Sequence, residues 1–290
     1  MEKKWDGKTK GSLWGYRFFV FCIRFFGVRF SYFFGLFVVT YYLIFSVKER
    51  NALVRFFQIG FSYPRGKSIR FAGKTFYRFA QVLIDRVALK TSRKRRYTHS
   101  FENEKALKEI YAHGKGGFFI SGHIGNWENA GQMIGERITA AIHVLMLDAE
   151  VEKIKKYLEQ QTETTKFQLI PIKEDMSHLI TIHQALKRND LIALHADRIM
   201  DQSKTFVMPF LNGLAKFPAG PFIMAYKFKV PVTFVFAIKE GPFHYALSAT
   251  DPIWKADSPE QLAEQYVKRL EEMVRKAPDQ WFNFYDYYAH

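Results

Sequence analysis

His123 and Glu128 stand five positions apart just after an apolar run, and together they have the residue types of a general-base pair. A histidine can take a proton from a hydroxyl or an amine near neutral pH, and a carboxylate can orient the imidazole and stabilise its protonated form. On one continuous helix, side chains five positions apart would point roughly 140° away from each other. The two side chains can therefore meet only if a turn separates them.

The sequence around the pair supplies such a turn. Residues 117–122 (GFFISG) predict a short buried strand, residues 127–137 predict a helix, and Gly125 and Asn126 lie between the two. An Asn suits the cap of that helix and a Glu suits its first turn. A histidine beside a glycine is nevertheless more often structural than catalytic, and this spacing also arises by chance. The rest of the sequence must show whether His123 is catalytic or structural.

Beyond residue 100 the chain alternates between strand and helix patterns. The predicted strands are 117–122, 140–147, 167–172, 191–195 and 231–238, with an added strand at 245–250. The predicted helices are 103–113, 127–137, 149–161, 176–188, 218–228 and 259–275. This alternation predicts an α/β fold with a largely parallel sheet flanked by helices, in which reactive groups gather at the carboxyl ends of the strands. His123 and the pair Asp197-Arg198 both follow strands in this way.

The charge of the chain is unevenly distributed. Of 290 residues, the first 100 hold 21 Lys and Arg against 4 Asp and Glu, within a net charge of +15. A positive lobe can bind nucleic acid, an anionic membrane surface or an acidic carrier protein. Its basic residues alternate with Phe-rich runs, which favours the membrane, and no nucleic-acid-binding motif accompanies them, so we expect no nucleic-acid partner. The single cysteine, Cys22, excludes an intramolecular disulfide.

The N-terminal region has the features of a membrane anchor. Residues 30–47 form an uncharged run of 18 residues, about 27 Å long as a helix, against a hydrocarbon thickness of roughly 30 Å. Residues 16–29 carry three arginines among apolar residues and are expected in the headgroup layer, and residues 67–89 predict a further amphipathic helix. We predict an N-terminal helical anchor in residues 1–95 and an α/β domain in residues 96–290. The alternative is an aromatic-rich helix packed in a globular core.

The sequence lacks the motifs of several common classes of enzyme. The chain has no Gly-x-Gly-x-x-Gly, no phosphate-binding Gly-x4-Gly-Lys loop, no Gly-x-Ser-x-Gly elbow and no His-Glu-x-x-His, so we predict no cofactor and no metal. A base-driven transfer remains. In it, His123 deprotonates an acceptor hydroxyl or amine that attacks an activated acyl carbonyl, while Glu128 holds the imidazole in place. Backbone N–H groups near Gly125 and Asn126 are candidates to stabilise the oxyanion.

Several segments occur in the order of a known family. They are His123-x4-Glu128, LKRNDL at 186–191 followed by Ala196-Asp197-Arg198, FVMPF at 206–210, FPAGP at 217–221 and PDQWF at 278–282. Together these segments resemble the late acyltransferases of lipid A biosynthesis, within the wider lysophospholipid and glycerol-phosphate acyltransferase superfamily. The family has Asp-Gln where this chain has Asp197-Arg198.

The resemblance implies an acyltransferase anchored at the cytoplasmic face of the bacterial inner membrane. Such an enzyme would move a fatty acyl chain from an acyl-carrier-protein or CoA thioester to a hydroxyl of a lipid A-type precursor. His123 and Glu128 would be the catalytic residues. The substrate-binding candidates are Asn126, Trp127, Asp197, Arg198, Phe217 and Gly220. Arg198 would hold a phosphate or form a plain salt bridge with a neighbouring aspartate, and Phe118, Phe119 and Phe217 would line an acyl channel or belong to the core.

Two segments depart from the family pattern. Residues 146–150 (MLDAE) and 284–288 (FYDYY) stand where members that act on lipid A carry basic stretches, which suit a phosphorylated acceptor. The same chemistry on another acceptor, an aminolipid or an aryl-polyene or pigment lipid, is therefore an alternative. A membrane-anchored binding protein without catalytic activity is the alternative from a different functional class.

Overall fold

The α/β body is built around a seven-stranded sheet. The computed structural model describes residues 13–89, 96–127, 138–147, 167–173, 175–199 and 203–288, together with Ala130 and Ile134. The strands are β1 (Thr98–Glu102), β2 (Gly117–Ser121), β3 (Ile142–Leu147), β4 (Phe167–Ile172), β5 (Leu191–His195), β8 (Val232–Gly241) and β9 (His244–Ala249). Their order across the sheet is β1-β9-β8-β2-β5-β3-β4, and neighbours are parallel except β8 and β9.

Helices and a separate hairpin complete the body. The helices are α5 (Glu104–Ala112), α8 (His178–Lys187), α9 (Gly220–Phe228) and α10 (Pro259–Lys276), followed by the short 3-10 helix η2 (Pro278–Gln280). Strands β6 (Thr205–Phe210) and β7 (Gly213–Pro218) form an antiparallel hairpin outside the main sheet. The central strand β2 is buried along its whole length, as expected for a parallel strand covered on both faces.

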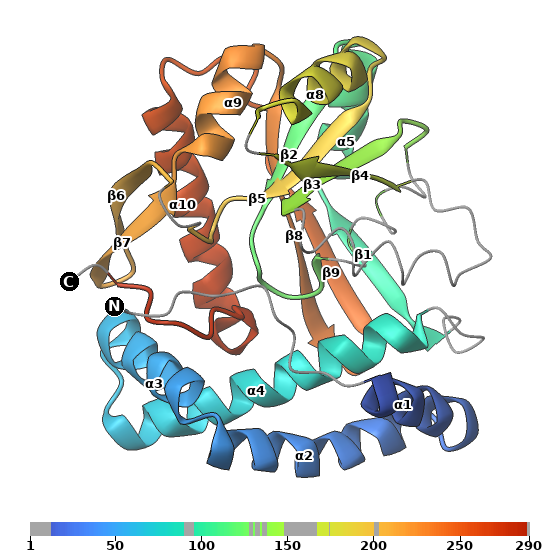
Figure 1. Cartoon of the computed structure of the whole chain (residues 1–290), viewed down its shortest axis with the longest axis vertical. Coiled ribbons are helices and arrows are strands. Elements are labelled where there is room, and N and C mark those ends of the chain that lie inside the picture. The colour runs from blue at the N-terminus through green and yellow to red at the C-terminus, as the bar shows by residue number, and fades with distance from the viewer. Residues whose placement is uncertain are drawn as a thin grey trace.

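Four N-terminal helices form a layer below the sheet in Figure 1: α1 (Leu13–Phe25), α2 (Val28–Phe45), α3 (Val47–Phe61) and α4 (Arg65–Ala88). The helix α4 runs across the molecule beneath the strands, and α2 lies along its other side. Ring contacts join the layer to the C-terminal segment, for example between Phe79 and Phe282 at 5.1 Å, and Arg78 pairs with Asp279 at 3.2 Å. The helical layer is therefore packed against the body along α4.

A buried ionic cluster adds to this contact. Asp85 of α4 and Lys239 of β8 form an ion pair whose two side chains are both 0% exposed. The hydroxyls of Tyr32, Tyr97 and Tyr245 all donate to the same carboxylate. Burial raises the pKa of Tyr245 and of Tyr97, and the neighbouring Asp85 charge raises both further, so these phenols stay protonated donors. Separating α4 from β8 would leave a buried charge uncompensated. The ion pair therefore fixes the helical layer to the sheet.

Most of the elements predicted from the sequence are present. The fold class is confirmed, and β4 and β5 have the predicted bounds. Strand β1, helix α3 and the β6–β7 hairpin were not predicted. The predicted helix at 149–161 lies outside the described residues, as does most of the one at 127–137. The predicted boundary at residues 95 and 96 stays a prediction, since residues 90–95 are also outside the described part.

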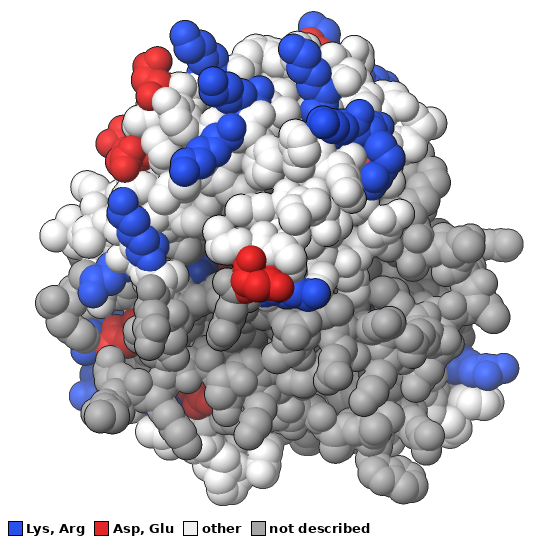
Figure 2. Space-filling view, turned by 45° about the horizontal axis from the view of Figure 1, so that its top comes forward, with Lys and Arg blue, Asp and Glu red and all other residues white. Residues whose placement is uncertain are grey.

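Basic side chains are also found at the far end of the body. Figure 2 turns the top of Figure 1 toward the viewer and shows Lys and Arg side chains spread over that end, with fewer Asp and Glu. The helices α8 and α9 end there in exposed basic residues, among them Lys187 and Lys227. The first 100 residues carry the excess of positive charge, but exposed basic side chains also lie on α8 and α9. The basic residues therefore do not form a single surface.

Candidate active site

The sheet brings His123 and Asp197 together. Strands β2 and β5 pair in parallel with Ser121 opposite His195, and His123 and Asp197 each lie two residues beyond these partners. The imidazole Nδ1 lies 2.7 Å from Oδ1 of Asp197. The His123 side chain is 14% exposed and that of Asp197 is 0% exposed. The site therefore holds a slightly accessible imidazole against a fully buried carboxylate.

Asp197 is held by three donors. Its Oδ1 accepts from the His123 ring, and its Oδ2 accepts from the His123 backbone N–H at 2.7 Å and from Trp281 Nε1–H at 2.9 Å. Burial alone would raise the pKa of Asp197, but the charge and hydrogen bond of His123, with the charge of Arg198, outweigh burial and lower it. An ionised carboxylate can only accept, so Nδ1 carries the proton and Nε2 keeps the lone pair of a base.

Aromatic rings surround the imidazole. The ring of His195 lies 4.6 Å from that of His123 between centroids, and the ring of Trp127 lies 5.1 Å away edge-on. Burial, followed by the charge of His123, lowers the pKa of His195 to about 3. His195 is therefore neutral near pH 7 and adds no positive charge beside His123. No group of three or more metal-ligating side chains occurs among the described residues.

The turn after β2 is fastened on two sides. The N–H of Gly125 donates to the Gln280 carbonyl at 2.9 Å, and the N–H of Asn126 donates to the Ala237 carbonyl at 2.8 Å. The Gln280 side chain bonds both the N–H and the carbonyl of Lys239. The N–H groups of Gly125 and Asn126 are therefore both used to hold the turn against β8 and the C-terminal segment. The prediction that backbone N–H groups near them stabilise an oxyanion stays a prediction for the neighbouring N–H groups.

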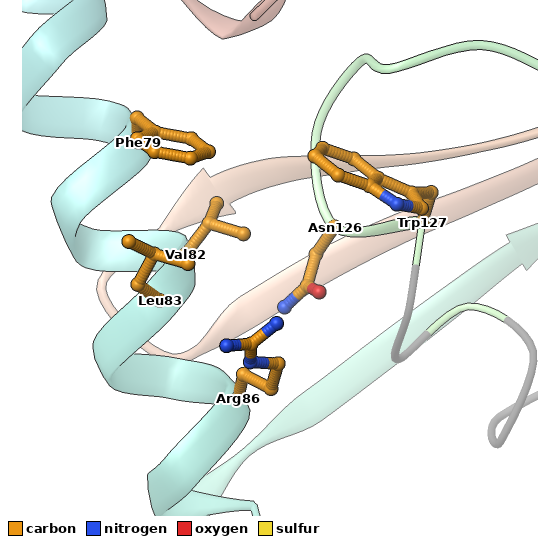
Figure 3. Close-up of a pocket in the computed structure, with 6 residues that line it drawn as sticks. All are labelled: Phe79, Val82, Leu83, Arg86, Asn126 and Trp127. Carbon is orange, nitrogen blue, oxygen red and sulfur yellow. The ribbon is translucent and has the colours of Figure 1, made fainter. Parts of the chain in front are cut away.

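A cleft adjoins the turn (Figure 3). It is lined by Phe79, Val82, Leu83 and Arg86 of α4 and by Asn126 and Trp127 of the turn. It is narrow, with a free volume of about 10 Å³, which is room for about one water molecule. In Figure 3 the Trp127 ring lies toward Phe79, and the Asn126 amide points toward the Arg86 guanidinium. The cleft thus has an apolar part and a cationic part, and Trp127 connects it to His123.

Comparison with known proteins places the chain in a family. The sequence model described as bacterial lipid A biosynthesis acyltransferase matches residues 2–288, nearly the whole chain. The chain belongs to this family. No curated protein matches it. As a lipid A biosynthesis acyltransferase it transfers an acyl group to a lipid A-type substrate, and the resemblance read from the sequence is confirmed.

The carboxylate that contacts His123 in this acyltransferase is not the one singled out from the motif. Asp197, expected to bind substrate, is buried at Nδ1 of His123, where an orienting carboxylate acts. Glu128 lies outside the described residues, so its predicted role stays a prediction. Asn126 is buried and Trp127 is half-buried, and both line the cleft.

The other predicted substrate residues hold the C-terminal segment, lie in the core or begin a helix. Arg198 donates to the Phe282 carbonyl at 3.0 Å and to the Asn283 side chain at 3.3 Å, and so holds the C-terminal segment. Phe217 is 0% exposed in the core, and Gly220 is exposed at the start of α9. The core interpretation also fits Phe118 and Phe119, which are buried on β2.

Three residues of the site were missed in the sequence. Trp281 holds Asp197, Gln280 holds the turn, and His195 lies beside His123. For Gln280 and Trp281 a signal existed, because both belong to the segment PDQWF at 278–282, one of those that resemble the family. For His195 the signal was its place at the end of a predicted strand, two residues before Asp197.

We expect Gly125→Ala to disrupt the site. Gly125 has φ +62°, and a Cβ there would lie 1.9 Å from the Ala237 backbone carbonyl oxygen. The left-handed conformation costs about 1–2 kcal/mol for a residue with a Cβ, and the clash adds to this. Thermal unfolding should show a destabilisation of more than about 2 kcal/mol, with activity lost in parallel. Gly66→Ala is the control, because nothing lies within 4 Å of a Cβ added there. Equal melting temperatures for the two variants would contradict this account of the turn.

Proposed function

We propose that this protein transfers a fatty acyl chain from a carrier thioester to a hydroxyl of a lipid A-type precursor, with His123 as general base. Nε2 of His123 takes the proton of the acceptor hydroxyl while its oxygen attacks the thioester carbonyl carbon. The tetrahedral intermediate then expels the thiolate as the C–S bond breaks. The imidazolium returns its proton to the leaving sulfur, so the imidazole is regenerated. No enzyme nucleophile takes part.

The contact between His123 and Asp197 is the observation that carries this proposal. The carboxylate at 2.7 Å from Nδ1 fixes the ring and its tautomer and stabilises the imidazolium that forms. His123 keeps 14% of its surface exposed, so a substrate can reach it. Glu128, the carboxylate of the family motif, is proposed as a second acidic group of the site rather than as the partner of Nδ1.

The surface around this narrow cleft beside α4 is proposed to contact the substrate. Its apolar lining suits an acyl chain or the lipid part of an acceptor, and Arg86 suits a phosphate or a carbonyl of either substrate. Acyl carrier protein is proposed as the donor carrier, with CoA as the alternative, because an acidic carrier would complement the positive charge of the first 100 residues.

The enzyme is proposed to work at the cytoplasmic face of the inner membrane, because its thioester donors are cytosolic. Among the described residues, α2 is the one helix long and apolar enough to cross a bilayer. This helix and the basic residues around it support membrane attachment through the N-terminal layer.

Mass spectrometry of lipids from cells that lack the gene tests the acceptor. We expect lipid A to lose one secondary acyl chain, and plasmid-borne wild-type protein, but not His123→Ala protein, to restore it. Intact lipid A with a changed aminolipid or pigment lipid would contradict lipid A as acceptor and favour the second acceptor class. Restoration by the His123→Ala protein would contradict the catalytic role and favour a binding protein.

A further inference from the structure

The outer side of α1 and α2 carries an exposed apolar surface, named here the aromatic face. Its residues are Phe18, Phe21, Phe25, Phe26, Phe30, Phe33, Leu36, Phe37, Tyr41, Ile44 and Phe45, each between 41% and 67% exposed. Rings touch along it, with centroids 4.6 Å apart for Phe21 and Phe25 and 4.9 Å apart for Phe26 and Phe30. A continuous apolar surface of this kind marks a binding surface rather than ordinary solvent exposure.

The inner side of α2 is used for packing against α4 along its whole length. The buried residues of α2 follow a helical stripe that faces α4: Val28, Ser31, Tyr32, Gly35 and Val39. Near one end of the contact Tyr32 donates to Asp85, and near the other end Val39 clusters with Ala72 and Phe76. The two helices therefore run antiparallel with one shared interface (Figure 1).

Helix α4 is unsuited to the interior of a bilayer. It carries six basic residues: Arg65, Lys67, Arg70, Lys74, Arg78 and Arg86. It also supplies Asp85 to the buried cluster with Lys239. If α2 crossed the membrane with this packing kept, the charges of α4 would enter the hydrocarbon. If α2 crossed alone, Asp85 would lose Tyr32 and the apolar residues of α4 would be uncovered. The observed packing fits neither arrangement.

We propose that α1 and α2 lie in the plane of the membrane, with the aromatic face in the hydrocarbon of one leaflet and α4 and the body above it. The apolar run that the sequence predicts as a marginal spanning segment is then an interfacial helix. This in-plane position of α1 and α2 rests on the membrane attachment proposed above and does not depend on acyl transfer.

The charges at the two ends of α2 fit an anionic lipid surface. Arg29 at its start and Lys48 just after its end are both exposed. The Arg29 guanidinium also lies 5.8 Å from the ring centroid of Phe243, in the turn between β8 and β9. The N-terminal end of α2 therefore lies next to the α/β body. Its C-terminal end leads directly into α3, which packs on α4. Both ends therefore belong to the same side of the membrane, where phosphate headgroups would contact the cations.

Sidedness of single cysteines tests this proposal in the full-length protein. Cys22 is the only cysteine of the chain, so Cys22→Ala gives a clean background. Arg29→Cys, Lys48→Cys and the reference Glu264→Cys on α10 are treated separately with a membrane-impermeant maleimide, in sealed inverted membrane vesicles and in spheroplasts. We expect all three to react from the same side. Reaction of Arg29→Cys and Lys48→Cys from opposite sides would mean that α2 spans the membrane and would overturn the proposal.

A second measurement tests the aromatic face itself. Phe33→Ser with Phe37→Ser removes two of its rings, and the purified variant is mixed with vesicles that contain phosphatidylglycerol. We expect the vesicle partition coefficient to fall on the order of 100-fold. Ile180→Ser is the matched control, since Ile180 is 63% exposed on α8, away from this face. An unchanged partition coefficient of the double variant, or an equal fall in the control, would contradict the proposal that α1 and α2 lie in the membrane plane. The lipid analysis above tests the reaction separately.

Discussion

Replacing His123 with Ala is expected to lower kcat/KM for acyl transfer by about 10²–10⁴-fold, the range of a lost general base. The substitution removes the imidazole that lies beyond the carboxyl ends of β2 and β5, with the lone pair of Nε2 directed away from Asp197. The rate should be measured with a long-chain acyl-carrier-protein thioester and a lipid A precursor in mixed micelles.

Two controls separate loss of the base from loss of the fold. His123→Gln keeps a polar side chain above Asp197 and should be equally inactive with a near-normal melting temperature. His183→Ala changes an exposed histidine on α8 and should be fully active. If His123→Ala kept activity within tenfold of wild type, His123 would not be the base.

Asp197→Asn is expected to lower kcat on the order of 10³-fold by changing the tautomer of His123. Two N–H groups, from the His123 backbone and the Trp281 ring, converge on Oδ2 of Asp197. An Asn at this position must place its oxygen there, so its NH₂ group faces Nδ1 of His123. That NH₂ donates to Nδ1, the ring proton moves to Nε2, and the base loses its lone pair. ¹⁵N chemical shifts of the His123 ring would report the change directly.

The same substitution should change how stability depends on pH. The pKa of Asp197 is lower in the folded protein than the ordinary value near 3.9 of an unfolded aspartate. Its stabilising effect is therefore present above about pH 4 and is lost as the pH falls through the lower folded-state value. The melting temperature of Asp197→Asn should vary less than that of wild type on the acid side. Parallel profiles would contradict a depressed pKa at this residue.

The identity of the partner carboxylate shows what the sequence could and could not predict. His123 and Asp197 were both assigned to strand ends, since each follows an apolar run. Their contact depends on the order of the strands in the sheet. Strands β3 and β4 precede β5 in the sequence, but β5 is the strand that pairs with β2. Local spacing cannot reveal such an order, so the carboxylate five positions away was favoured over one 74 positions away.

The unpredicted elements have similar physical reasons. The dipeptide Asn212-Gly213 gives a turn signal near the β6–β7 hairpin, but the structure turns at Leu211-Asn212, and the two strands lie outside the main alternation. The helices α2 and α3 are separated by Ser46 alone, so the apolar run merges with the helix that follows. The sequence predicted an apolar helix at 30–47 but not that α4 would cover one of its sides. That packing is a tertiary contact, and it decides how the helix can meet a membrane.

A double-mutant cycle tests most directly whether His123 and Asp197 act as one unit. The kcat/KM for acyl transfer is measured for wild type, His123→Gln, Asp197→Asn and the double variant. Residues that act together are strongly non-additive, because removing the second costs nothing once the first is gone. We predict that the double variant is no slower than His123→Gln alone. A double variant slowed by the product of the two single effects would show that the residues act independently and would contradict the proposed mechanism.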